Sequence, residues 1–126
     1  MIIKDDIFIA DLKDDFELEG KNNEEFSLFN FINGDLNKAF WFGFYYDEWK
    51  ESIWIPFMVR KQVRHLYESI VQYNPQLEWL NSKRPNNLMM LDYVNYILDN
   101  IIYESYSDLV KIAIVLGIHV KSKYND

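Results

Sequence analysis

A concentration of aromatic residues between positions 39 and 57 constrains the fold of this chain more than any other feature. This aromatic window holds nine of the 22 aromatic residues and has the sequence AFWFGFYYDEWKESIWIPF. Aromatic and β-branched residues favour strands, and the polar residues from Asp47 to Glu51 allow the chain to turn. We therefore expect a β-hairpin with strands at 39–46 and 52–56. The alternative is a helix capped by Asp35, which would be aromatic around its whole circumference and therefore buried on all sides.

The chain beyond the aromatic window carries helical patterns. Apolar residues spaced three or four apart predict helices over 57–73 and 87–103. A last helix is expected from Ser107 or Asp108 to Leu116, with Gly117 in the left-handed stop position. Because β-branched residues are frequent there, a strand remains an alternative for residues 109–120. Between the two longer helices we expect a short helix at 75–81 and a loop at 82–86.

The first third of the chain allows two interpretations. Alternating acidic and apolar residues between 2 and 19 predict short strands that end near Gly20, whereas Phe8, Leu12 and Phe16 are spaced four apart as on one face of a helix. A short helix is expected from Glu24 to Ile32, followed by the stop signal Asn33-Gly34.

Length and composition limit the architecture. A chain of 126 residues with 49% apolar residues has room for one domain with a single core. We expect one globular domain at 1–126, made of an acidic segment at 1–25, the aromatic window at 39–57 and a helical part at 57–118. The expected fold is predominantly α, with a helical bundle in the C-terminal half, and α+β overall because of the hairpin and short strands in the N-terminal half.

Location is constrained by what the sequence lacks. No apolar run approaches the roughly 20 residues of a membrane-spanning helix, and no signal peptide is visible after Met1. The chain has no cysteine, which excludes disulfides and thiolate metal sites. We therefore expect a soluble, cytoplasmic protein that does not bind membranes.

Net charge is concentrated in the first two-fifths of the chain. Residues 1–51 contain 13 acids and five bases, a net charge of −8, whereas residues 52–126 contain eight bases and seven acids, a net charge of +1. A field of one sign steers oppositely charged surfaces into contact, so this asymmetry indicates a basic partner.

No motif for catalysis, cofactor binding or metal binding is found. His65 and His119 have no second soft or borderline ligand, histidine or cysteine, three or four residues away, and the four glycines are too scattered to cradle a phosphate. Asp47 and Glu48, which lie between Tyr46 and Trp49, are the only carboxylates with the apolar neighbours that acid–base catalysis needs. We expect no enzyme activity, no cofactor and no metal.

Nucleic-acid binding has one weak signal. The bases Arg60, Lys61 and Arg64, followed by His65, cluster in the first two turns of the expected helix at 57–73, where the helix dipole disfavours cations. The net charge of −7 opposes phosphate binding, which depends on several uncompensated cations. Direct binding of DNA or RNA is therefore not expected.

Protein recognition remains as the expected function. Aromatic residues favour interface cores, and acidic surfaces accelerate association with basic targets. The chain's character is that of a small acidic inhibitor of immunity or antitoxin type, which neutralises a basic partner such as a nuclease toxin by imitating nucleic acid. The expected partner-binding residues are Asp11, Asp14, Asp15, Glu17, Glu19, Asp47, Glu48, Trp49 and Glu51. The alternative is a self-associating accessory protein of a phage or mobile element, whose homodimer surface combines the aromatic window with the Met89-Met90 helix.

Overall fold

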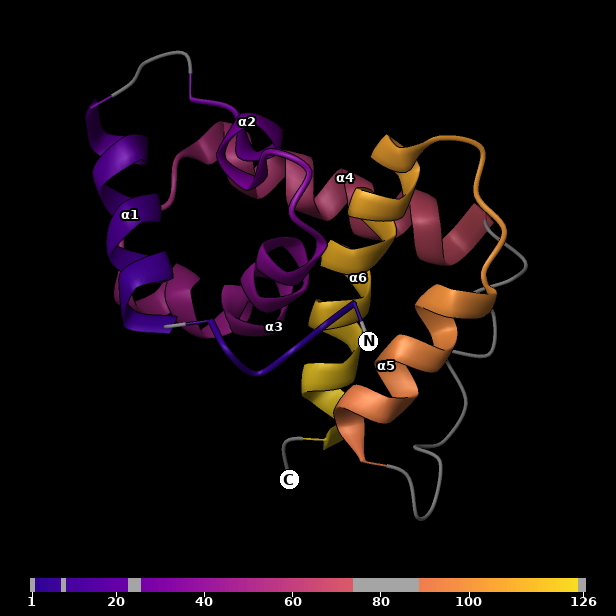
Figure 1. Cartoon of the computed structure of the whole chain (residues 1–126). Helices are drawn as coiled ribbons and strands as arrows, with labels where there is room; N and C mark the ends of the chain where they lie inside the picture. The colour runs from indigo at the N-terminus through magenta and orange to yellow at the C-terminus, as the bar shows by residue number, and fades with distance from the viewer. Residues whose placement is uncertain (1, 8, 23–25, 74–88, 125–126) are drawn as a thin grey trace.

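The computed structural model describes residues 2–7, 9–22, 26–73 and 89–124. Within these residues the chain forms helices and no strand (Figure 1). The helices are α1 (Ile9–Asn22), α2 (Leu28–Ile32), α3 (Leu36–Ser52), α4 (Phe57–Tyr73), α5 (Met90–Asn100) and α6 (Tyr106–Tyr124). The expected α+β class is therefore wrong, since the described N-terminal half is helical like the rest.

The expected β-hairpin in the aromatic window is wrong. Helix α3 covers the residues expected to form the first strand and the turn of that hairpin. Asp35 caps this helix, with its side chain accepting a hydrogen bond from the Lys38 N–H at 3.1 Å. The buried residues of α3 lie around most of its circumference: Leu36, Ala39, Phe40, Trp41, Phe42, Gly43, Tyr46 and Trp49. A helix that is apolar all round is stable only when other elements cover it, and here α1, α2 and α6 do so.

The crossing of α3 and α6 is the centre of the fold, and glycine makes it possible. Gly43 of α3 and Gly117 of α6 are both fully helical and lie against the backbone of the opposite helix. Gly117 was expected to end the last helix, but α6 continues past it to Tyr124, and the strand alternative for 109–120 is also wrong. Glycine occurs both where two helix backbones approach each other closely and where a helix ends, so the local sequence does not distinguish these two roles.

The N-terminal segment adopts the helical alternative in part. Within α1, Leu12 and Phe16 are buried, as the four-residue spacing predicts; Phe8 lies outside the described residues. The Phe16 ring packs against Phe31 of α2 and against Trp49 of α3. The described residues at 2–7 and 9–19 form no strand. Burying the apolar side of this helix stabilises the fold more than forming an isolated, acid-rich strand would.

The predicted boundaries of the remaining helices agree with the structure to different degrees. Helix α4 has the predicted bounds, whereas α5 is shorter than expected at both described ends. The stop at Asn33-Gly34 is confirmed, since Asn33 has φ 51° and Gly34 has φ 75°. Helix α2 begins at Leu28, later than expected. The predicted short helix at 75–81 and the loop at 82–86 lie outside the described residues.

Residues 2–7 form an extended segment that joins α3 to α5. The buried Asn95 of α5 accepts hydrogen bonds from the N–H groups of Ile2 and Ile3, and donates one to the Ile3 carbonyl. On the other side, the Trp41 indole N–H donates to the Lys4 carbonyl at 2.8 Å. The start of the described chain is therefore held by side chains from both helices.

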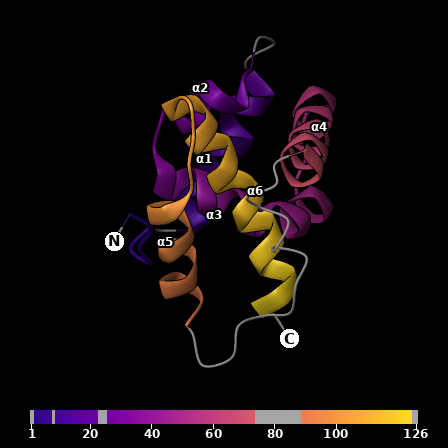
Figure 2. The ribbon, with the colours of Figure 1, turned by 90° about the vertical axis from the view of Figure 1, so that its right-hand side faces the viewer.

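Helices α4 and α5 lie on opposite sides of α6 (Figure 2). One flank of α4 lies beside α3, and Phe57 and Met58 at the start of α4 are exposed, whereas Val59 is buried. Among the described helices none combines the length and apolarity needed to cross a membrane.

Candidate functional site

The first candidate surface is the outward face of α1. Its exposed residues recur at helical spacings along α1, whereas Leu12 and Phe16 of the same helix are buried in the core. We define the α1 acidic face as the exposed residues Asp11, Asp14, Asp15, Leu18 and Glu19. In Figure 1 this helix is at the edge of the molecule. Four of the five α1 acids expected to bind a partner are therefore together and exposed; Glu17, the fifth, is half-buried on a flank.

Leu18 gives this face an apolar centre. Its side chain is 62% exposed, and acids precede and follow it on the same helical surface. Within the described residues, none of the four acids of the face forms an ion pair with a lysine or arginine. An apolar side chain surrounded by uncompensated charge is the arrangement of an interface centre with a polar rim.

The acids expected near Trp49 do not form one surface with each other. Asp47 forms an ion pair with Lys50 at 3.0 Å and faces the side of α3 that adjoins α4. Glu48 lies on the other side, near Tyr45. Burial raises the pKa of the Tyr45 phenol, and the charges of Glu48 and Asp5 add to this effect. Glu51 is exposed in the last turn of α3.

Trp49 is not available to a partner. Its side chain is 3% exposed, and its ring packs against Phe16, Phe42 and Tyr45. Trp49 was expected to bind a partner, but its burial leaves almost none of its ring exposed for such a contact. The charged residues beside it in sequence point to other sides of the helix. Trp54, by contrast, is 57% exposed in the connection after α3.

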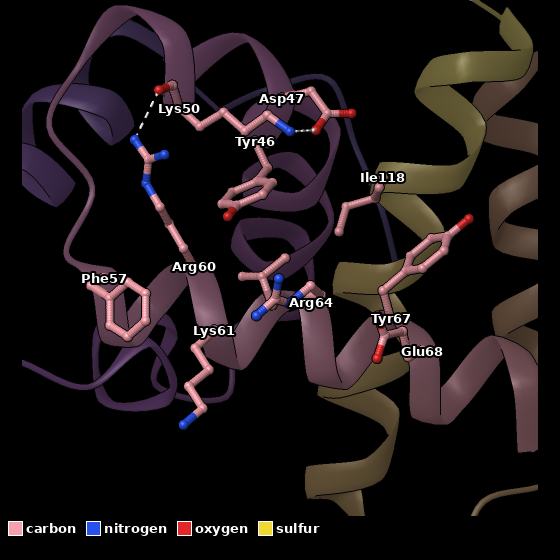
Figure 3. A pocket seen from close by; sticks show the side chains of 11 residues that line it. Tyr46, Asp47, Lys50, Phe57, Arg60, Lys61, Arg64, Tyr67, Glu68 and Ile118 are labelled. Atoms are coloured by element: carbon pink, nitrogen blue, oxygen red, sulfur yellow. Dashed lines mark hydrogen bonds and ion pairs between the residues drawn. The ribbon is translucent and has the colours of Figure 1, made fainter.

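A second candidate surface is a groove between α3, α4 and α6, with a volume of about 670 Å³ (Figure 3). Tyr46 contributes its floor, and Figure 3 shows the Tyr46 ring directed into it between Lys50 and Arg64. The groove is lined by Tyr46, Asp47, Lys50, Phe57, Arg60, Lys61, Val63, Arg64, Tyr67, Glu68 and Ile118.

One hydrogen bond and several positive charges lie at the cationic end of the groove. The Arg60 guanidinium donates to the Lys50 carbonyl at 3.0 Å, which ties the start of α4 to the end of α3. Burial raises the pKa of the Tyr46 phenol, while the charges of Lys50, Arg60 and Arg64 act in the opposite direction. All three cations are therefore near enough to Tyr46 to act on its phenol. The pKa of Lys50 is itself raised, mainly by its hydrogen bond to Asp47.

The other end of the groove is closed by Tyr67. Burial, followed by the charge of Asp47, raises the pKa of its phenol. The Tyr67 hydroxyl is 3.4 Å from Nδ1 of the buried His119, so this histidine lies behind the groove wall. Neither Glu48 nor a histidine lines the groove.

The described residues of these surfaces form no site suited to acid–base catalysis or metal binding. Asp47 and Glu48 are both exposed, so they do not have the apolar enclosure that would make one of them a general acid. In the part of the chain that the structure describes, no three histidine or acidic side chains are grouped to hold a metal ion.

The sequence indicated only some of the residues that line the groove. The bases at 60, 61 and 64 were noted as a cluster, but Tyr46 belongs to a window expected to form a hairpin. Only the helical alternative places Tyr46 opposite α4, and no local pattern indicates that contact. Comparison with protein-family models, with curated proteins and with solved structures found no match to this chain.

Proposed function

We propose that this protein acts by binding another protein, as a small acidic inhibitor of immunity or antitoxin type. Its partner is a basic protein, such as a nuclease toxin, whose active or substrate-binding surface it covers. The observation that carries the proposal is the α1 acidic face, where four exposed carboxylates, none paired with a base among the described residues, lie around the exposed Leu18. The lack of cysteine suits action in the cytoplasm.

Two physical effects support this role. Carboxylates in a row attract a basic surface and raise the association rate, especially at low salt. Leu18 then supplies apolar burial at the centre of the contact, which slows dissociation. Because Phe16 anchors the opposite side of α1 in the core, the face is presented on a fixed helix. A preorganised helix loses little entropy on binding.

The test begins with capture of the basic partner by the tagged protein from its native source, followed by an assay of the partner's nuclease activity. Asp14→Lys with Asp15→Lys should slow association by at least about tenfold at low salt, because steering accounts for factors of that size. Leu18→Ala should instead speed dissociation. The matched control is Asp92→Lys with Asp99→Lys, which makes the same charge change on the exposed side of α5.

Inhibition of the partner by wild type and by the α5 control, and its loss in the α1 variant, is the expected pattern. Equal association rates for all three proteins would show that the α1 face is not the binding surface. A captured partner whose activity is unchanged by this protein would remove the inhibitory role.

Self-association is the second candidate function. The aromatic window cannot provide its surface, since most of those side chains are in the core. Large apolar side chains are nevertheless exposed along α5 and the following connection: Met89, Tyr96, Ile102, Tyr103 and Tyr106. If copies pair through this side, sedimentation equilibrium will show a dimer that Tyr96→Glu dissociates and Leu18→Glu does not. A monomer at all concentrations excludes this candidate.

A further inference from the structure

The groove between α3, α4 and α6 reverses the sign of charge that dominates this protein. Its walls carry four cations and two carboxylates, a local charge of +2 on a chain of −7. Lys50 is neutralised by Asp47, but no carboxylate among the described residues pairs with Arg60, Lys61 or Arg64. As far as the described residues go, the groove is therefore a cationic site whose charge is not balanced by paired carboxylates, and it is separate from the α1 acidic face.

The cations do not serve the helix that carries them. Arg60, Lys61 and Arg64 occupy the first two turns of α4, where the partial positive charge of the helix end repels them. Opposite charges at Arg64 and Glu68 are spaced to pair along the helix, yet the structure gives no ion pair between them. Local electrostatics thus oppose this cluster, and an anion in the groove would compensate both the side chains and the helix end.

The groove carries three donor groups, Arg60, Arg64 and the Tyr46 hydroxyl, and a separate apolar wall. Arg60 and Arg64 are one helical turn apart, and the Tyr46 hydroxyl lies on the floor between them (Figure 3). Beyond them the Tyr67 ring and Ile118 form the apolar end of the groove, with Asp47 and Glu68 at its margins. Its volume of about 670 Å³ is in the range of sites that enclose small organic molecules.

We propose that this groove binds an organic phosphate that carries a planar ring, of about the size of a nucleoside monophosphate. A phosphate monoester has three terminal oxygens for Arg60, Arg64 and the Tyr46 hydroxyl, and its charge of nearly −2 at neutral pH matches the +2 of the groove. The ring packs against Tyr67 and Ile118, where Asp47 and Glu68 accept hydrogen bonds from amino groups attached to the ring.

Calorimetric titration of the wild-type chain with adenosine monophosphate, inorganic phosphate and adenosine tests the proposal. We expect the monophosphate to bind at least about tenfold more tightly than either fragment, since the phosphate and ring contacts add. Arg60→Ala with Arg64→Ala should weaken the monophosphate at least about tenfold through loss of charge-assisted hydrogen bonds. Tyr46→Phe should weaken it less, because it removes a single hydroxyl.

The matched control is Lys4→Ala with Lys13→Ala, which removes two positive charges away from the groove and should leave the affinity unchanged. Near-ultraviolet circular dichroism of each variant checks that the fold is kept. In nitrogen-15 spectra, the Arg60 and Arg64 side-chain N–H signals should shift on titration with the monophosphate.

Three results would overturn the proposal. The first is no binding of the monophosphate. The second is equal affinity for the monophosphate and inorganic phosphate, which would leave the ring without a role. The third is binding of a short single-stranded DNA through the same arginines without binding of the monophosphate, which would make the groove a contact for a nucleic-acid backbone.

Discussion

Gly43 of α3 and Gly117 of α6 lie where the two helices cross, each against the backbone of the other. A Cβ atom at Gly43 would overlap the Ile114 carbonyl, with its carbon at 2.9 Å. A Cβ atom at Gly117 would overlap the Phe40 carbonyl oxygen and lie 2.7 Å from the Phe44 nitrogen. Because the obstructing atoms belong to backbone, they cannot rotate away, and the helices would have to separate.

Gly43→Ala and Gly117→Ala should therefore each destabilise the fold. Overpacking costs about 1–3 kcal/mol or more, and the better helix propensity of alanine offsets only about 1 kcal/mol of this. We expect each variant to unfold at lower urea concentration. The control is Gly20→Ala in α1, where the new methyl group would meet only Pro56 side-chain atoms at 3.5 and 3.6 Å, an ordinary contact. Gly20→Ala should be neutral or stabilising; the same loss in all three variants would contradict the close crossing.

The tryptophans at 49 and 54 should differ sharply on truncation. Trp49 is 3% exposed among Phe16, Phe42 and Tyr45, so Trp49→Ala should lower the free energy of unfolding by about 3–5 kcal/mol. Trp54 is 57% exposed, so Trp54→Ala should change it by less than about 0.5 kcal/mol. Urea unfolding followed by circular dichroism measures both values. Similar losses for the two variants would contradict the packing of α3.

The helices differ in how far the sequence predicts them. Helices α4 and α5 have one apolar side, so their spacing predicts helix and even the bounds of α4. Helix α3 is apolar almost all round, so periodicity disappears and intrinsic preference favours strand. Which aromatic residue is buried then depends on the covering helices, and these are known only once the chain has folded.

The candidate surfaces divide in the same way. The acids of α1 were identifiable because one helix carries them, and four of the five are exposed together. The acids near Trp49 were expected to form a surface but point to different sides of α3. The groove needs residues from three helices, and only its arginine and lysine cluster is local in sequence. Sites made by tertiary contact leave little trace in a single chain.

The cap of α3 can be isolated by comparing two helix starts. Asp35 accepts a hydrogen bond from the Lys38 N–H, whereas Ser27 at the start of α2 makes no side-chain cap. Asp35→Ala should therefore cost about 1 kcal/mol, and Ser27→Ala should cost much less. Thermal or urea unfolding of both variants provides the measurement. An equal effect at the two positions would contradict the capping role of Asp35.

Tyr46 should make the fold sensitive to alkaline pH. Burial raises its pKa above the usual value near 10, so the unfolded chain loses this proton before the folded chain does. The contribution of Tyr46 is thus complete below about pH 10 and decreases as pH rises through its folded pKa. We expect the urea midpoint of wild type to fall between about pH 9 and 11 more steeply than that of Tyr46→Phe, which has no proton to lose. Parallel curves would contradict a raised pKa at Tyr46.

Asn95 connects the N-terminal segment to α5, and its amide chemistry is the basis of the last prediction. It accepts from the Ile2 and Ile3 N–H groups and donates to the carbonyls of Ile3 and Leu91, at 2.8–3.0 Å. Ile3 is fully buried, so Asn95→Ala leaves its backbone groups unpaired at a cost of about 1–3 kcal/mol.

Asn95→Asp separates the accepting role from the donating role. The new carboxylate still accepts from Ile2 and Ile3, but it places negative charge against two carbonyl oxygens in a buried site. Its folded pKa should therefore exceed the unfolded value near 3.9, and stability should be lost as pH rises through that folded pKa. We expect this variant to be much closer to wild type at about pH 4 than at about pH 7 when both are unfolded in urea. The control is Asn100→Asp, whose exposed side chain donates to the Tyr96 carbonyl from the same helix and should show little of this dependence. A deficit at Asn95→Asp that does not change with pH would mean that the lost donor, rather than the buried charge, governs this contact.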